Sequence, residues 1–108
     1  MKFEEILSFT RNAAGYLKAD GVPFLAVQVN FTGDEGGVLY VEVKDGKVSV
    51  EPYEYNDRSC AITISMDDFS KLIVGKLDPV AAFTTGKLKV EGDIGKALEF
   101  ANLMKKSR

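Results

Sequence analysis

The hydrophobic positions follow two different periods along the chain, so helices and strands can be assigned segment by segment. Residues 2–19 repeat an apolar side chain every three or four positions, which predicts an amphipathic helix. Its expected buried stripe comprises Phe3, Ile6, Leu7, Thr10, Ala13, Ala14 and Leu17. We expect this helix to end at Asp20-Gly21 and Pro23, because glycine accepts a left-handed turn and proline cannot continue a helix.

Five segments alternate apolar and polar residues with a period of two, which predicts strands. They are residues 24–32, 38–44, 47–51, 60–65 and 87–91. Such regular alternation is typical of antiparallel pairing, with one face of the sheet covered and the other in contact with water. Asp45-Gly46 predicts a tight hairpin between the second and third strands.

Three more helices are predicted after the fourth strand. Ser65 caps the first, with Asp68 in the capping-box position, and Phe69, Leu72 and Ile73 form its buried stripe. Asp78 caps the second, with Pro79 in its first turn. We expect Val80 and Phe83 to face inward there. Asp93 caps the last helix, whose expected stripe is Ile94, Ala97, Leu98, Ala101 and Met104.

The resulting order, α-β-β-β-β-α-α-β-α, predicts an α+β fold of two layers. A five-stranded, mainly antiparallel sheet carries all of the helices on one face. The first and last helices each have an additional apolar pair outside the main stripe, Phe9 with Tyr16 and Phe100 with Leu103. Three interpretations remain open for these pairs: ordinary surface positions, a ligand cavity, or a contact between two copies of the chain.

Length and charge narrow the classes of function. The 108 residues are expected to form one domain, 1–108. The net charge of −2 argues against binding to nucleic acid. The basic end, Lys105-Lys106-Ser107-Arg108, is interpreted as a solvated helix terminus, with weak contact to an anionic membrane surface as the alternative. A single cysteine, an acidic start and no long apolar run lead us to expect a cytoplasmic protein.

The sequence lacks the residues on which most catalytic sites depend. The sequence contains no histidine, which removes the common nucleophile-activating base and the usual zinc ligand. Cys60 is expected to be a buried, inert thiol. Residues 51–57 contain three carboxylates but lack the order of a calcium loop, so we interpret them as a solvated strand end and turn. Gly86-Lys87 lacks the remaining residues of a phosphate loop. We therefore expect a binding module without catalytic residues, metal or cofactor.

The region from residue 38 to 106 resembles the sterol-binding domain of the type-2 sterol carrier protein family. The residues that carry the resemblance run in order: Ile62-Thr63-Ile64-Ser65, Asp68-Phe69, Gly75-Lys76-Leu77-Asp78-Pro79, Ala82-Phe83, Gly86-Lys87-Leu88-Lys89-Val90, Gly92-Asp93, Leu98 and Leu103-Met104. Each piece is common alone, but a glycine-lysine-leucine that occurs twice around a proline-started helix is specific.

The resemblance implies a non-catalytic lipid carrier. In that family an apolar tunnel between sheet and helices accepts sterols, fatty acids, fatty acyl-CoA or phospholipids. The apolar positions expected to line it here are Ile62, Ile64, Phe69, Leu72, Ile73, Phe83, Leu98, Phe100, Ala101 and Met104. The alternative function is a homodimeric interaction module with a fully packed core, in which Phe9, Tyr16, Phe100 and Leu103 form the interface. A third, an enzyme that acts on acyl-CoA, is less favoured.

Overall fold

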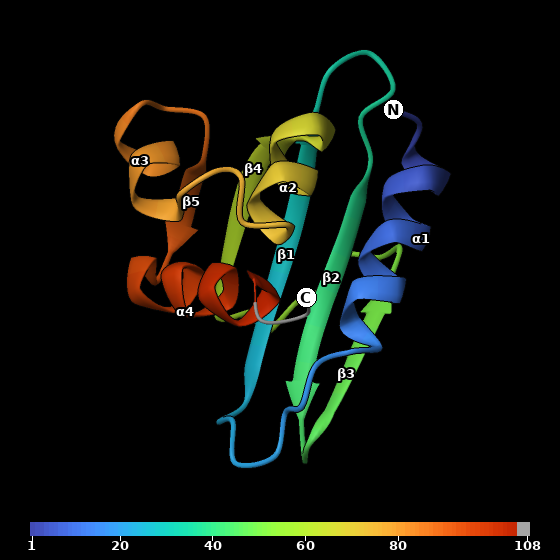
Figure 1. Ribbon diagram of the computed structural model, residues 1–108, viewed down its shortest axis with the longest axis vertical. Coiled ribbons are helices and arrows are strands. Elements are labelled where there is room, and N and C mark those ends of the chain that lie inside the picture. The colour runs from blue at the N-terminus through green and yellow to red at the C-terminus, as the bar shows by residue number, and fades with distance from the viewer. Residues whose placement is uncertain (106–108) are drawn as a thin grey trace.

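The computed structural model describes residues 1–105 and confirms the expected α+β order of elements (Figure 1). The helices are α1 (Phe3–Ala14), α2 (Met66–Ile73), α3 (Pro79–Thr84) and α4 (Ile94–Lys105). The strands are β1 (Leu25–Thr32), β2 (Val38–Lys44), β3 (Lys47–Glu51), β4 (Cys60–Ser65) and β5 (Lys89–Gly92).

The five strands form one mixed sheet in the order β3-β2-β1-β4-β5. Three neighbouring pairs are antiparallel, as expected, whereas β1 and β4 run parallel. A parallel neighbour requires a crossover connection. Residues 52–59 supply it, since they lead from edge strand β3 to β4 on the far side of β1.

The helices cover one face of this sheet (Figure 1). Helix α1 packs over β3, α4 packs over β1 and β4, and α2 contacts both of these helices. A chain of aromatic rings joins the layers: the ring centroids of Phe31 and Phe69 lie 5.4 Å apart, and those of Phe69 and Phe100 lie 6.3 Å apart. Each buried side chain of this size contributes roughly 1.5–3 kcal/mol to folding. The core is therefore centred where β1, α2 and α4 meet.

The local signals for turns and helix starts are confirmed. Asp45 and Gly46 have φ values of 51° and 78°, as the predicted hairpin requires. The side chain of Ser65 accepts a hydrogen bond from the backbone N–H of Asp68, and that of Asp78 accepts one from Ala81. These three features are short-range, so neighbouring residues alone determine them.

Two element boundaries were predicted wrongly. The first helix ends at Ala14 instead of residue 19, because Gly15 follows it and the backbone N–H groups of Tyr16 and Leu17 bond to carbonyls three residues back. The last strand spans residues 89–92 instead of 87–91, although Leu88 is buried just before it.

The inward faces of α3 and α4 also differ from the prediction. Helix α3 buries Pro79 and Ala82, whereas Val80 and Phe83 are exposed. The buried stripe of α4 consists of Ala97, Phe100, Ala101 and Met104, whereas Ile94 is exposed and Leu98 is half-buried. Two overlapping apolar stripes run along α4, and the stripe that contains Phe100 is the one buried against the core.

Within residues 1–105, none of the helices combines the length and hydropathy required to cross a bilayer. Of the basic C-terminal sequence, residues 106–108 lie outside the described residues. The interpretation of this end as a solvated helix terminus, and the alternative of a membrane contact, therefore stay predictions.

Candidate functional site

Eight of the ten residues expected to line a tunnel meet between the sheet and the helices. They come from β4, α2 and α4, and each of them is at most 1% exposed: Ile62, Ile64, Phe69, Leu72, Ile73, Phe100, Ala101 and Met104. The other two lie elsewhere, since Leu98 is half-buried and Phe83 is 40% exposed on α3. The eight side chains pack in the hydrophobic core, and we call them the eight-residue wall.

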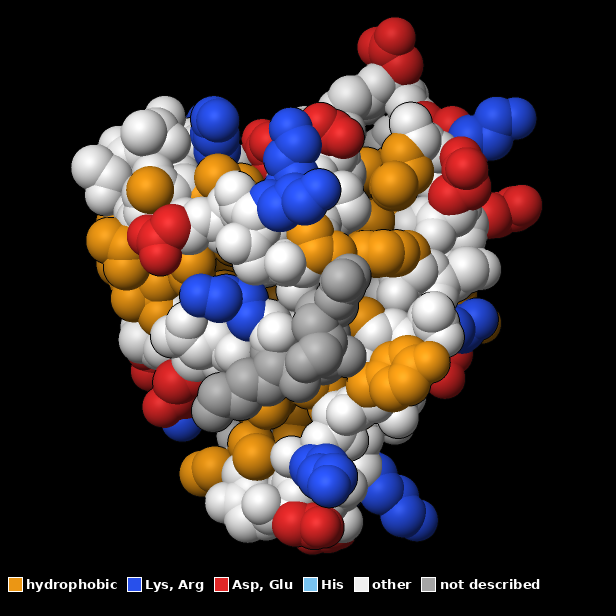
Figure 2. Space-filling view, in the orientation of Figure 1, with side chains coloured by type: hydrophobic (Ala, Val, Ile, Leu, Met, Phe, Trp, Pro, Cys, Tyr) orange, Lys and Arg blue, Asp and Glu red, His pale blue; other side chains and the backbone are white. Residues whose placement is uncertain are grey.

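An open cavity of about 310 Å³ lies at one end of this wall. It is bounded by Val22, Pro23 and Leu25 on the approach to β1, and by Glu99, Asn102 and Leu103 on α4. In Figure 2 hydrophobic side chains are visible in the hollow below α4. The volume is at the lower end of the range for small-molecule sites, and an apolar wall with a few polar groups is typical of such sites.

The cavity is bordered by residues that adjoin the core in sequence. Leu25 is buried and begins the covered face of β1, which continues through Val27 and Val29. On α4, Leu103 is followed by the fully buried Met104. Hydrophobic side chains of both layers therefore lie next to this cavity.

The sequence drew attention to only part of this cavity. Leu103 stood out as an apolar residue outside the main stripe, and Leu25 lies in the predicted strand 24–32. Val22 drew no attention, and Pro23 was interpreted only as a signal that ends the first helix. Their place beside α4 depends on how the loop between α1 and β1 folds back, and no periodic signal reports that.

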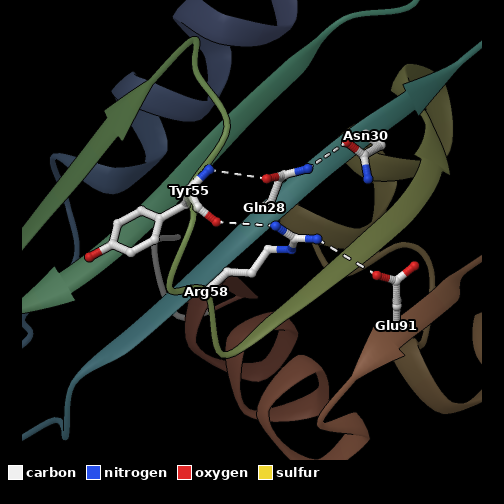
Figure 3. A network of polar contacts seen from close by, with 5 residues as sticks. All are labelled: Gln28, Asn30, Tyr55, Arg58 and Glu91. Atoms are coloured by element: carbon white, nitrogen blue, oxygen red, sulfur yellow. Dashed lines mark hydrogen bonds and ion pairs between the residues drawn. The ribbon is translucent and has the colours of Figure 1, made fainter.

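The crossover segment, residues 52–59, packs on part of the opposite face of the sheet (Figure 3). The side-chain carbonyl of Gln28 accepts a hydrogen bond from the backbone N–H of Tyr55 at 3.0 Å, and its amide donates to Asn30 at 3.0 Å. Arg58 donates to the carbonyl of Tyr55 at 3.3 Å and pairs with Glu91 at 3.6 Å. Glu51 ends β3, and Glu54 and Asp57 are exposed, as expected for a solvated strand end and turn, whereas Tyr55 packs on the sheet.

A tyrosine–carboxylate contact strengthens this attachment. The hydroxyl of Tyr55 donates to Glu42 at 2.6 Å, and its ring lies edge-on to that of Tyr40, with centroids 5.0 Å apart. The hydrogen bond to Glu42, aided by burial, raises the pKa of Tyr55 to about 12. Burial is also the main cause that raises the pKa of Tyr40, followed by the nearby carboxylate of Glu51. Both hydroxyls therefore stay protonated at neutral pH.

The one thiol is poorly suited to nucleophilic chemistry. Cys60 lies on the covered side of β4, and burial raises the pKa of its thiol to about 11, with a smaller contribution from Asp93. A thiol must ionise before it attacks a substrate or binds a metal. Across residues 1–105, no group of three histidine, cysteine or acidic side chains is arranged to hold a metal ion. The candidate site is an apolar one.

The helix-covered sheet places the chain in the class of two-layer α+β proteins, with an apolar cavity at the seam between its layers. Within that class the sequence profile of the SCP-2 sterol transfer family matches residues 5–105. The chain belongs to this family, and the resemblance noted from its motifs is confirmed.

Curated relatives match the chain over a limited part of their own length. Human sterol carrier protein 2 is 41% identical over 71 residues, which are 66% of this chain and 13% of the human protein. Mouse hydroxysteroid dehydrogenase-like protein 2 is 36% identical over 78 residues, which are 71% of this chain and 16% of that protein. The shared region is thus a small part of each relative.

Solved structures share the whole fold. The solution structure of palmitated SCP2L2 from Aedes aegypti superposes with a TM-score of 0.70 and 22% identity. The superposition covers 96% of this chain and 95% of the mosquito protein. At that identity the likeness establishes the fold alone.

Proposed function

We propose that residues 1–108 act as one non-catalytic lipid-binding domain, which carries a fatty acid, fatty acyl-CoA, sterol or phospholipid between its helices and its sheet. The cavity bounded by Leu25 and Leu103 is the observation that carries this proposal, because it opens at the seam between the two layers. The palmitated state of the mosquito structure supports an acyl ligand for the shared fold.

The proposed mechanism is partition of an apolar chain out of water. Burial contributes about 0.8 kcal/mol per methylene, so a chain of about sixteen carbons gains roughly 12 kcal/mol before opposing terms. Ordering of the chain and loss of its free motion offset much of this gain. An apolar wall recognises length and shape weakly, so we expect micromolar or tighter binding with broad specificity.

The ligand chain extends, in this proposal, past the cavity into the eight-residue wall. Met104 suits such a role because an unbranched thioether side chain adapts to different shapes. Ala101 lies next to Met104 in the buried stripe of α4. Its small side chain occupies little of the volume between helix and sheet. We infer that α4 shifts outward when the ligand enters.

The experiment is displacement of a fluorescent fatty acid from delipidated protein by natural acyl ligands. Leu103→Trp fills the cavity, so we expect about tenfold weaker binding or more, because a blocked chain loses burial of one or two methylenes at least. Val80→Trp adds the same ring on the outer face of α3 and serves as the matched control, with affinity unchanged. Equal affinity in the wild type and Leu103→Trp would contradict the proposed entrance. A wild type that binds no fatty acid would overturn the carrier function.

Several features support the non-catalytic part of the proposal. The sequence lacks histidine, and the raised pKa of Cys60 keeps its thiol protonated. Turnover of acyl-CoA by the purified protein above that of boiled protein would contradict it.

We propose the cytoplasm as the place of action, where a free, buried cysteine such as Cys60 is ordinary. Subcellular fractionation tests this assignment.

A further inference from the structure

Two polar side chains stand at the open side of the cavity between α4 and the loop before β1. Glu99 and Asn102 line it from α4, which lies over β1 (Figure 1). They are three positions apart, hence on one face of the helix, and both residues are exposed. Leu25, on the far side of the cavity, is only 3% exposed. The polar pair therefore lies next to water, and the apolar residues lead inward.

The carboxylate of Glu99 has one oxygen available to a ligand. Its Oε2 pairs with the ammonium group of Lys96 at 3.3 Å, one turn earlier on α4. Such an exposed ion pair is weak. The hydrogen bonds among residues 1–105 involve neither Oε1 of Glu99 nor the side-chain amide of Asn102.

Positive charge is absent from the described lining of the cavity. Among residues 1–105, no lysine or arginine lines it, and Lys96 and Lys105 lie on the same helix but outside the lining. The polar groups that a ligand meets are therefore one carboxylate and one neutral amide. An anion placed there would face the like charge of Glu99 before it could reach Lys96.

An uncharged hydroxyl group matches both polar side chains. In the proposed carrier the hydrocarbon chain extends inward, so the head group of the lipid stays beside Glu99 and Asn102. A hydroxyl donates its proton to the carboxylate of Glu99 and accepts an N–H from the amide of Asn102. An ionised carboxylate or phosphate has no proton to donate. A cationic head group would compete with Lys96, which already contacts the same carboxylate.

We propose that Glu99 and Asn102 select lipids with an uncharged hydroxyl head group, such as sterols, fatty alcohols and monoacylglycerols, over fatty acids and fatty acyl-CoA. The inference rests on the proposed carrier function, since it assigns a ligand class to the same cavity. Water screens the exposed charge of Glu99, so the preference is modest, about fivefold against a carboxylate. Fatty acids still bind through their chains, because the apolar wall supplies most of the affinity.

The experiment measures how dodecanol and dodecanoate displace a fluorescent fatty acid from delipidated protein. The two ligands share one chain and differ only in the head group. Because the head groups also differ in hydration, the deciding quantity is the change in their affinity ratio that a substitution causes. Glu99→Gln removes the negative charge and leaves Lys96 unpaired. We expect dodecanoate to bind about fivefold more tightly to this variant and dodecanol about twofold more weakly, which shifts the ratio about tenfold.

The matched control is Glu54→Gln, which removes the same charge at an exposed position of the crossover segment. It should change the ratio by less than about twofold, because salt screens distant exposed charges. Asn102→Asp tests the opposite direction, since a second carboxylate at the cavity should weaken dodecanoate about fivefold. Asn12→Asp, at an exposed position of α1, is the control for that variant. Thermal unfolding verifies that each variant is folded.

Three results would overturn the selection by head group. They are an unchanged ratio in Glu99→Gln, an equal shift in Glu99→Gln and Glu54→Gln, and tighter binding of dodecylamine than of dodecanol to the wild type. The last result would show that Glu99 pairs with a cation instead of an alcohol.

The same measurements separate this inference from the proposed function. A wild type that binds neither dodecanol nor dodecanoate removes the carrier function itself. A wild type that binds both, with a ratio that Glu99→Gln and Asn102→Asp leave unchanged, retains the carrier function and removes only the selection by these two residues.

Discussion

At the scale of single residues, a hydrogen bond of 2.6 Å joins the crossover segment to the sheet. Tyr55 and Glu42 form a short hydroxyl–carboxylate hydrogen bond. The carboxylate accepts a hydrogen bond from the protonated hydroxyl and would repel a phenolate, which raises the pKa of Tyr55 to about 12. No local sequence pattern predicts this contact, because the two residues lie on different segments that meet only after the chain crosses over the sheet.

The Tyr55 contact predicts a loss of stability at alkaline pH. In the unfolded chain the tyrosine ionises near its ordinary pKa of about 10, whereas the folded protein holds the proton to about 12. The folded state therefore binds more protons between these values, and the stabilisation is complete below pH 10 and lost as the pH rises toward 12. Urea unfolding at a series of pH values measures the effect.

Tyr55→Phe should flatten the decline in the free energy of unfolding between pH 10 and 12. Absorbance titration of this variant should lack the tyrosine that ionises last in the wild type. Tyr16→Phe, at an exposed position, serves as the control and should retain the decline. If Tyr55→Phe and wild type lose stability in parallel, the contact contributes no such linkage.

At the scale of elements, signals that lie within a few residues predicted the helix starts, whereas the inward faces of two helices needed the tertiary structure. Ser65 and Asp78 cap α2 and α3 as expected. Helix α4 has apolar residues on most of its circumference, so its period admits two stripes. The stripe with Phe100 is buried because its ring stacks against Phe69. Leu98 and Phe83 were predicted to line the tunnel because the sequence alone does not show which face of each helix is buried.

The cap of α2 predicts a matched pair of serine variants. Ser65→Ala removes the acceptor for the N–H of Asp68 and should lower the free energy of unfolding by about 1 kcal/mol. Ser70→Ala is the control within the same helix, where its hydroxyl bonds only to the carbonyl of Asp67. It should change stability by less than about 0.5 kcal/mol, because alanine is the better helix former. Equal losses in urea unfolding would show that the cap contributes nothing.

At the scale of the whole molecule, the position of the candidate site follows from what covers each face of the sheet. The helices close one face of the sheet, and residues 52–59 close part of the other by their bonds to Gln28. The cavity is therefore formed on the helix side, where α4 and the loop before β1 leave a gap. In the proposed carrier function, α4 moves against this sheet when a ligand enters.

The crossover predicts a third effect on stability. Gln28→Ala leaves the N–H of Tyr55 without its acceptor in a buried place, which should lower the free energy of unfolding by about 1–3 kcal/mol. For a domain of this size each kcal/mol lowers the melting temperature by about 4–8 °C. Calorimetry of Gln28→Ala measures the shift.

Asn30→Ala is the control, because it removes only the acceptor for the side-chain amide of Gln28 and leaves the crossover bond intact. We expect it to lose less than half as much stability as Gln28→Ala. A larger loss in Asn30→Ala would assign the support of the back face to a different contact.

The sequence by itself determined the class of fold, the order of elements, the hairpin turn, two helix caps and the family. These follow from periodicity and short-range hydrogen bonds, which act among residues close together in the chain. Only the tertiary structure decided which face of α3 and α4 is buried, that β1 and β4 run parallel, and that Val22 and Pro23 meet Leu103 around a cavity. These features depend on packing between distant segments, where volume and shape select one arrangement among several with the same hydrophobic pattern.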